Sequence, residues 1–168
     1  MTTAIDSNVI IALWDRDLTM SSATQTALEA AFHRGGLVIA APVFAALLAA
    51  PGRTEAFVES FLKDIAIAAD WNQDEMVWRA AGRALQRYAE RRRKQHESGT
   101  RWILADFMTG AHAETRGHRL LTRDERVYRA AVRESFDYAI ADEIHQLAAD
   151  TQPVRLGRST LASRMQIP

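Results

Sequence analysis

The sequence of 168 residues contains no cysteine, which excludes disulfide bonds, thiolate zinc sites and cysteine nucleophiles. It also has no excess charge of either sign, because 21 lysines and arginines balance 21 aspartates and glutamates. Any contact with nucleic acid must therefore come from a local patch. No apolar run approaches the roughly 20 residues of a membrane span, and no signal segment is recognisable at the N-terminus. We expect a cytoplasmic protein.

Common catalytic and nucleotide-binding motifs are also missing. The chain has no P-loop, no G-x-G-x-x-G and no G-x-S-x-G, and no two of its five histidines stand four residues apart. His112 and His118 are both expected on the surface. We expect the tryptophans to be core or interface anchors and not base-stacking platforms. They are Trp14, Trp71, Trp78 and Trp102.

Short apolar segments alternate with helical segments along the chain. The strand candidates are residues 2–5, 37–40, 65–68, 119–122 and 138–140. The helix candidates are residues 9–14, 23–34, 42–50, 54–63, 74–96 and 101–117. This alternation predicts an α/β fold, with a parallel sheet of about five strands and helices on both faces. We expect one domain over residues 1–140 and a C-terminal extension of unknown role over residues 141–168.

Three aspartates stand where the carboxyl ends of such strands would meet. Asp6 interrupts the apolar run in "TTAIDSNVIIALW", and Asp124 follows a strand in "RLLTRDERVY". Asp106 lies in the helix "RWILADFMTGAHAE", on a stripe of small and apolar residues that predicts an inward-pointing side chain. Open parallel sheets bind their ligands beyond the carboxyl ends of the strands. The three acids are therefore candidates for one site.

Each acid also has a structural interpretation. Asp6 and Asp124 could be helix N-caps, and Asp106 could pair with Arg101 or Arg119. Carboxylates brought within ~4 Å of each other repel by about 4 kcal/mol at an effective dielectric near 20. A divalent cation would remove that cost, and ligation by oxygen alone suits Mg²⁺ or Mn²⁺.

The three acidic segments, "AIDSNVIIALW", "ILADFMTGAHA" and "LLTRDERVY", resemble the motifs of PIN-domain ribonucleases. The resemblance is to VapC-type toxins of bacterial toxin–antitoxin pairs and covers residues 3–128. It implies a PIN-like three-layer sandwich and Mg²⁺-dependent cleavage of RNA, often tRNA or rRNA. It further implies Asp6, Asp106 and Asp124 as metal-site carboxylates.

The resemblance extends to supporting residues and partners. It implies that Ser7 or Asn8 and Thr122 orient the acids by hydrogen bonding. Relatives of this type are usually homodimers whose activity is blocked by a cognate antitoxin.

An Asp-phosphorylated receiver is a poorer match, because Asp6 stands alone after its strand and no lysine follows Lys94.

One departure from the family pattern concerns residue 46. The family usually has a glutamate in the helix after the second strand, but in "APVFAALLAAPG" the matching residue is Ala46. Alanine has no ligating atom, so we expect this chain to be a weakened or inactive nuclease. The alternative is a catalytically dead PIN-fold protein that acts by binding antitoxin or RNA.

A stripe of arginines forms a second candidate site. Arg79, Arg83, Arg87 and Arg91 recur every four residues on the long predicted helix and lead into "RRRK". A solvated helix face would show the same pattern. The functional interpretation is a patch that contacts RNA phosphates, for which arginine is well suited. Beside this stripe, Trp78, Ala81, Leu85 and Tyr88 are predicted as an apolar stripe.

Overall fold

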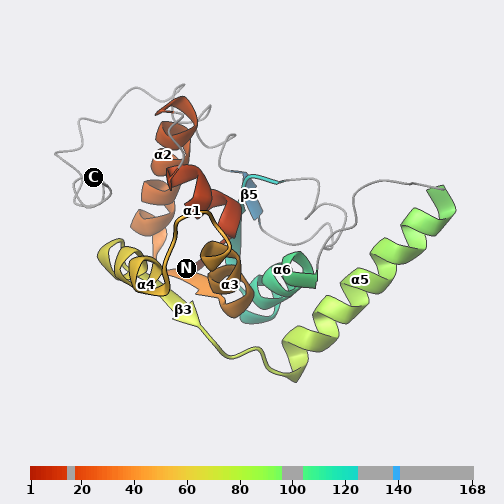
Figure 1. Ribbon diagram of the computed structural model, residues 1–168. Helices are drawn as coiled ribbons and strands as arrows, with labels where there is room; N and C mark the ends of the chain where they lie inside the picture. Colours follow the sequence, from red (N-terminus) through yellow and green to blue (C-terminus); the bar gives the residue numbers. More distant parts are fainter. Residues whose placement is uncertain (15–17, 96–103, 125–137, 141–168) are drawn as a thin grey trace.

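The computed structural model describes residues 1–14, 18–95, 104–124 and 138–140 (Figure 1). Helices and strands alternate along these residues, as the sequence predicts. The strands are β1 (Thr3–Ile5), β2 (Leu37–Ala40), β3 (Ile67–Asp70), β4 (Arg119–Thr122) and β5 (Tyr138–Ile140). The helices are α1 (Ser7–Trp14), α2 (Leu18–Arg34), α3 (Ala41–Leu48), α4 (Glu55–Asp64), α5 (Glu75–Gln95) and α6 (Leu104–Arg116).

The strands form one parallel sheet in the order β3-β2-β1-β4-β5. This confirms the predicted α/β fold with a sheet flanked by helices. β1 and β2 are buried along their whole length, because helices cover both faces of a parallel sheet. In the register, Ala4 lies opposite Val38 of β2 and Leu120 of β4. The carboxyl ends of β1, β2, β3 and β4 therefore lie level along one edge.

Local sequence signals set several helix boundaries. Pro42 lies in the first turn of α3, where a missing N–H costs nothing. Thr54 caps α4, its hydroxyl oxygen accepting a hydrogen bond from the Phe57 N–H at 3.2 Å. Asp74 caps α5 in the same way through the Val77 N–H, also at 3.2 Å. Gly117 ends α6 with a left-handed φ of 62°, the conformation that favours glycine.

The predicted boundaries differ most clearly from the structure at two elements. β3 was expected at residues 65–68 but spans Ile67–Asp70. Ile65 instead closes α4, its N–H donating to the Phe61 carbonyl, and Ala66 turns the chain with a φ of 56°. α2 begins at Leu18 and so includes Ser21 and Ser22, which were expected to precede it. Serine favours helix starts but does not prevent a helix from continuing through it.

Two apolar clusters hold the fold together. The larger one joins β1–β4 to α1–α4, with Ile5, Ile39, Leu47 and Leu121 fully buried at its centre. The smaller one lies between α5 and α6. It contains Val77, Ala80, Ala81, Ala84, Phe107, Met108 and Ala111.

α5 leaves the sheet along an extended connection, and its far end projects from the other helices (Figure 1). The apolar stripe predicted on this helix is partly wrong. Ala81, Leu85 and Tyr88 pack toward α6, but Trp78 is exposed and Val77 takes the buried place. No helix of the described segments is long and apolar enough to cross a membrane.

Candidate active site at the carboxyl edge of the sheet

Asp6 lies at the junction of β1 and α1. Its N–H donates to the Leu121 carbonyl at 3.0 Å, so it continues the ladder between β1 and β4. Its carbonyl accepts from the Val9 N–H at 3.1 Å, at the start of α1. The residue is only 6% exposed. The backbone therefore fixes Asp6 from both sides, and its carboxylate stays at the sheet edge.

Three neutral side chains donate hydrogen bonds to the Asp6 carboxylate. The Thr122 hydroxyl and the Asn8 amide both reach Oδ2 at 2.8 Å. The Ser7 hydroxyl approaches Oδ1 at 3.4 Å, which is a weaker contact. The family resemblance implies such a role for Ser7 or Asn8 and for Thr122, and in the structure all three side chains contact Asp6.

Asn8 and Thr122 also bond to each other and to the chain after β4. The Asn8 side-chain amide donates to the Thr122 hydroxyl at 3.1 Å, and its side-chain oxygen Oδ1 accepts from the Arg123 N–H at 3.1 Å. The Thr122 oxygen accepts a further bond from the Asp124 N–H at 3.1 Å. With two donors aimed at its oxygen, the Thr122 hydroxyl has its proton directed at Asp6. The network therefore links the ends of β1 and β4 and orients the acid.

Asp106 and Asp124 reach this edge from α6 and β4. Asp106 is half-buried in the first turn of α6, and Asp124 is exposed two residues after the end of β4. α6 packs on β4 and enters it through the two residues 117–118, so the helix and the strand run in opposite directions. Its first turn therefore lies toward the carboxyl ends of the strands. Arg101, one of the two expected partners of Asp106, lies outside the described residues.

The chemistry of the donors at this edge suits a hard cation. Carboxylate, hydroxyl and amide oxygens are the ligands that Mg²⁺ prefers, and Mg²⁺ commonly takes one or two carboxylates while keeping several waters. Within the described residues, no three Asp, Glu, His or Cys side chains are grouped so that they could hold a metal ion. The oxygen atoms at this edge fit a Mg²⁺ ion that is bound by one or two carboxylates. A ligand set of three aspartates stays a prediction.

Ala46 lies in the second turn of α3 and is half-buried. This helix starts directly after β2, at the same edge as Asp6, and it packs against α1 and α6. A longer side chain on this helix would begin close to the elements that carry Asp6 and Asp106. The helix itself, "APVFAALL", contains no acidic residue.

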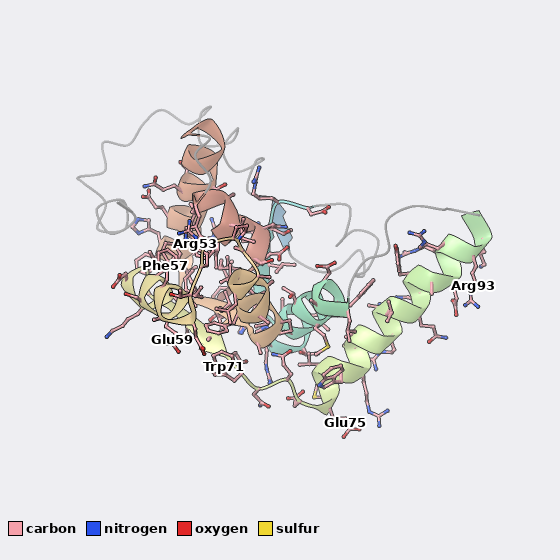
Figure 2. The ribbon with its side chains drawn as sticks, viewed as in Figure 1. Arg53, Phe57, Glu59, Trp71, Glu75 and Arg93 are labelled. Carbon is pink, nitrogen blue, oxygen red and sulfur yellow. The ribbon has the colours of Figure 1, made fainter. Side chains whose placement is uncertain are left out.

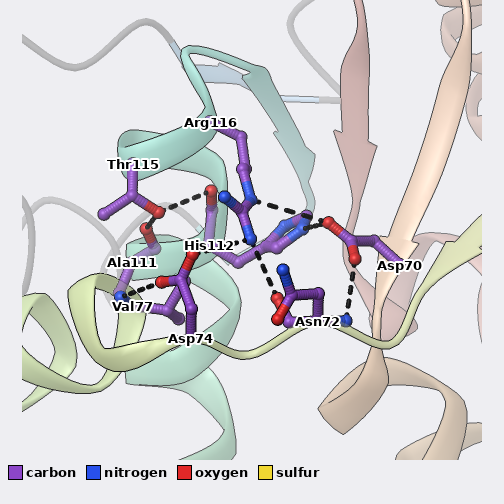
Figure 3. A network of polar contacts seen from close by, with 8 residues as sticks. All are labelled: Asp70, Asn72, Asp74, Val77, Ala111, His112, Thr115 and Arg116. Atoms are coloured by element: carbon purple, nitrogen blue, oxygen red, sulfur yellow. Dashed lines mark hydrogen bonds and ion pairs between the residues drawn. The ribbon is translucent and has the colours of Figure 1, made fainter.

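A second polar network at this edge was missed by the sequence analysis (Figure 3). Asp70, the last residue of β3, bonds through Oδ2 to His112 Nε2 at 2.9 Å. Arg116 lies 3.6 Å from the same oxygen and 3.1 Å from Asp74 Oδ2, and it donates to the Asn72 carbonyl at 3.1 Å. The network joins the β3–α5 connection to α6.

The structure corrects the prediction that both histidines lie on the surface. His112 has no exposed area, and His118 is partly buried with its ring 5.7 Å from that of His112. His112 and Arg116 stand four residues apart on α6, and Asp70 ends a strand. The four-residue spacing of these two basic side chains, together with an aspartate elsewhere that could face them, was the sequence feature that could have predicted this network.

The pKa values of Asp70, Asp74 and the neighbouring His118 are shifted in this region. Burial raises the pKa of Asp70, but its hydrogen bonds with His112 and the Asn72 N–H, together with the positive charges nearby, bring it below its usual value. The Val77 N–H, helped by Arg116, lowers the pKa of Asp74. Burial, together with the charge of His112, lowers the pKa of His118.

The arginine stripe is exposed along α5, as a solvated face or an RNA-binding patch would both require. Arg79, Arg83, Arg87 and Arg91 all face solvent, and Arg79 pairs with Glu75 at 2.6 Å. α5 has six arginines and one lysine against two glutamates, a formal charge of +5. Because the whole chain is neutral, the other residues together carry −5. Positive charge is thus concentrated on one helix.

The tryptophans divide between the core and the surface. Trp14 packs against the larger cluster, edge-on to Phe57 and Phe61, as expected for a core anchor. Trp71 and Trp78 are exposed, so a core role is wrong for both. Trp102 lies outside the described residues, as does the predicted C-terminal extension.

A model of a known protein family matches most of the chain. The model of the PIN domain matches residues 3–133, which include Asp6, Asp106 and Asp124. Comparison with curated proteins gives no match.

Solved structures share the fold at low sequence identity. VapBC-1 from nontypeable Haemophilus influenzae superposes with a TM-score of 0.60 at 15% identity, over 84% of this chain and 98% of that one. FitAcB from Neisseria gonorrhoeae gives 0.56 at 18% identity, over 83% and 97%. VapBC2 from Rickettsia felis, solved with a DNA fragment from its promoter, gives 0.55 at 12% identity, over 83% and 98%.

Proposed function

The chain belongs to the PIN domain family, and we propose that it is a metal-dependent endoribonuclease of the VapC type, the toxin of a toxin–antitoxin pair. The observation that carries this proposal is the Asp6 site. A nearly buried carboxylate is held at the carboxyl edge of a parallel sheet by Asn8 and Thr122. A carboxylate so oriented is suited to the binding of a cation.

Mg²⁺ or Mn²⁺ is the proposed cofactor. Asp6 and Asp106 would be its principal protein ligands, with Asp124 completing the acidic cluster. When bound, such an ion activates water and stabilises charge that builds on a phosphate. The contribution of the chain itself is to orient Asp6 through Ser7 and Asn8 and through the Thr122 hydroxyl.

The proposed substrate is RNA, such as tRNA or rRNA. The arginines at positions 79, 83, 87 and 91 are the proposed phosphate contacts. The concentration of positive charge on α5 supports this assignment, because a polyanion would be attracted to this helix and not to the acidic remainder of the chain.

A cognate antitoxin and a second copy of the chain are the proposed protein partners. Solved structures with the same fold include the toxin–antitoxin complexes VapBC and FitAB. Their likeness to this chain is one of fold, and it makes an antitoxin the first partner to test. An antitoxin that inserts a basic side chain among the acids would neutralise the site.

Ala46 supports a second candidate function, which is binding without cleavage. A methyl group stands where the family pattern places a glutamate, and α3 offers no other acid. Losing a group that supports a metal ligand typically costs ~10–100-fold in metal affinity or activity. A chain weakened to that extent could act by binding antitoxin or RNA without cutting.

The test is cleavage of total tRNA and rRNA by this chain and by Ala46→Glu, each with Mg²⁺, with Mn²⁺ and with EDTA. We expect the glutamate variant to cut at least ~10-fold faster, and EDTA to stop it. Asp6→Asn in the Ala46→Glu background is the control, since it keeps the size and polarity of the side chain while removing its charge.

Each outcome separates the candidates. Cutting by both forms at the same rate would mean that the aspartates suffice and that residue 46 is unimportant. Cutting that survives EDTA or Asp6→Asn would contradict the metal site. If neither form cuts any RNA, the nuclease proposal is wrong and the binding function is favoured.

A further inference from the structure

Large apolar side chains are exposed around the start of α5. Trp71, Met76 and Trp78 are 61%, 63% and 52% exposed, and all three fall within eight consecutive residues. Single exposed apolar residues are ordinary, but three large ones in so short a segment indicate a part of the surface that could bind a ligand. Tryptophan in particular is enriched at binding surfaces, because its ring is large and rigid.

Trp71 contacts α3 through its ring, and backbone hydrogen bonds shape the loop around it. One edge of its ring packs on Phe44 of α3, with ring centroids 4.9 Å apart at 67°. Its carbonyl accepts from the Gln73 N–H at 3.1 Å, and next to it the Asn72 N–H donates to Asp70 at 2.8 Å. Arg116 binds the Asn72 carbonyl from α6. Figure 2 labels Trp71 at the connection between β3 and α5.

The position of Trp71 relative to the candidate active site follows from the sheet register. Asp70 lies opposite Ala40 of β2, and continuation of the β1–β2 register places Ala40 level with Asp6. β1 and β3 flank β2, so the backbones at Asp6 and Asp70 are about 10 Å apart, which is two strand spacings. Trp71 comes directly after Asp70. One extended RNA strand could therefore contact the Asp6 site and Trp71 together.

The charge of the neighbouring helix indicates what would bind here. α5 begins four residues after Trp71 and carries a formal +5, with Arg79 directly after Trp78. Exposed aromatic rings beside arginines are the arrangement by which proteins bind single-stranded nucleic acid, with bases stacked on rings and phosphates held by cations. A duplex offers no unstacked base to such a ring. An apolar protein partner would not require the positive charge.

We propose that Trp71, with Trp78 beside it on the chain, is a base-stacking subsite for single-stranded RNA next to the Asp6 site. This deepens the proposed function and rests on it for the identity of the ligand as RNA. It replaces the expectation that these tryptophans are core or interface anchors and not base-stacking platforms, and it assigns to them the selection of unpaired RNA. The arginines of α5 supply attraction that does not depend on base pairing.

The test is binding of a short labelled single-stranded RNA and of its duplex, measured by fluorescence anisotropy in EDTA so that no cleavage occurs. We expect Trp71→Leu to weaken single-strand binding about tenfold, the effect of losing one stacked base. Trp71→Phe should retain most of the affinity, because a ring remains. Duplex binding should change little in either variant.

Met76→Ala is the matched control, since it removes an equally exposed apolar side chain that has no ring. Circular dichroism should show that each variant keeps the wild-type fold. Intrinsic tryptophan fluorescence provides a second readout. We expect single-stranded RNA to quench the emission of the wild type more than that of Trp71→Phe.

Several results would overturn the proposal. If Trp71→Leu binds RNA as well as the wild type does, the ring is not a subsite, whatever the fate of the nuclease proposal. If sedimentation shows that Trp71→Leu splits a dimer while RNA affinity is unchanged, the ring is a subunit contact. If the wild type binds no RNA in EDTA and cuts none in Mg²⁺, both the subsite and the proposed function are wrong.

Discussion

Asp6 and Asp70 occupy equivalent places in the fold but have different surroundings. Each lies at the carboxyl end of a parallel strand, at the same level of the sheet, with β2 between them. Two hydroxyls and an amide, which are neutral groups, donate to the Asp6 carboxylate. Asp70 instead bonds to the His112 ring and lies beside the Arg116 guanidinium.

The difference shows how one sheet edge can serve both stability and chemistry. The basic partners of Asp70 come from α6 and tie the β3–α5 connection to that helix, so this acid acts as a structural clamp. The neutral donors of Asp6 come from its own turn and from the end of β4, and they fix the direction of the carboxylate without adding a positive charge. We therefore expect stability to depend more on the Asp70 network and activity more on the Asp6 network.

The largest predicted effect is the loss of the buried member of the clamp. His112→Ala removes a fully buried ring and the hydrogen bond that it makes with Asp70, which should lower the free energy of unfolding by about 3 kcal/mol. Urea unfolding followed by circular dichroism measures this. His33→Ala, at an exposed position on α2, is the control and should be near neutral. A cost for His112→Ala below about 1 kcal/mol would show that the network is not a clamp.

A smaller effect is expected at the Asp6 site. Thr122→Val keeps the shape of a buried side chain but removes the hydroxyl that bonds Asp6, Asn8 and the Asp124 N–H. We expect a loss of about 1–2 kcal/mol in unfolding free energy, measured in the same way. Thr115→Val, which removes a hydroxyl bonded to the Ala111 and His112 carbonyls within α6, serves as the comparison. The distinction between the two networks fails if Thr122→Val destabilises the protein more than His112→Ala does.

The smallest predicted effect is a dependence of stability on pH near the clamp. The folded protein holds the pKa of His118 below its ordinary value of 6.5, so the unfolded chain binds more protons there. The contribution of His118 to the free energy of unfolding is fully present above pH 6.5 and decreases as the pH drops through that value. The urea concentration at the unfolding midpoint should therefore decrease as the pH is lowered from about 7 to about 5. His118→Asn should flatten this slope, while His33→Asn should not. An unchanged slope in His118→Asn would place the titrating group elsewhere.

A second window lies at lower pH and belongs to the carboxylates. Asp70 and Asp74 both have a pKa below the ordinary 3.8 in the folded protein. Their contribution is complete above that value and is lost as the pH falls through the lowered pKa. The two windows are therefore distinguishable in one series of measurements.

Much of the fold could be predicted because its signals are local. Alternating apolar and amphipathic segments gave the order of the elements, and Pro42, Thr54 and Gly117 marked helix ends by their own backbone and side-chain preferences. β3 was misplaced because Ala66 adopts a left-handed φ that sequence patterns assign to glycine. The family resemblance is confirmed over residues 3–133. The roles of the three aspartates stay predictions.

The sequence alone determined where acids and strands fall along the chain, since residue type and periodicity are properties of neighbouring residues. Only the tertiary structure decided which side chains meet. Thr122 bonds Asp6 across 116 positions, and His112 bonds Asp70 across 42. His112 is buried and Trp71 is exposed, the reverse of what their separate chemistries predict. Strand register and helix packing bring such distant residues together, and no pattern within a single segment specifies that arrangement.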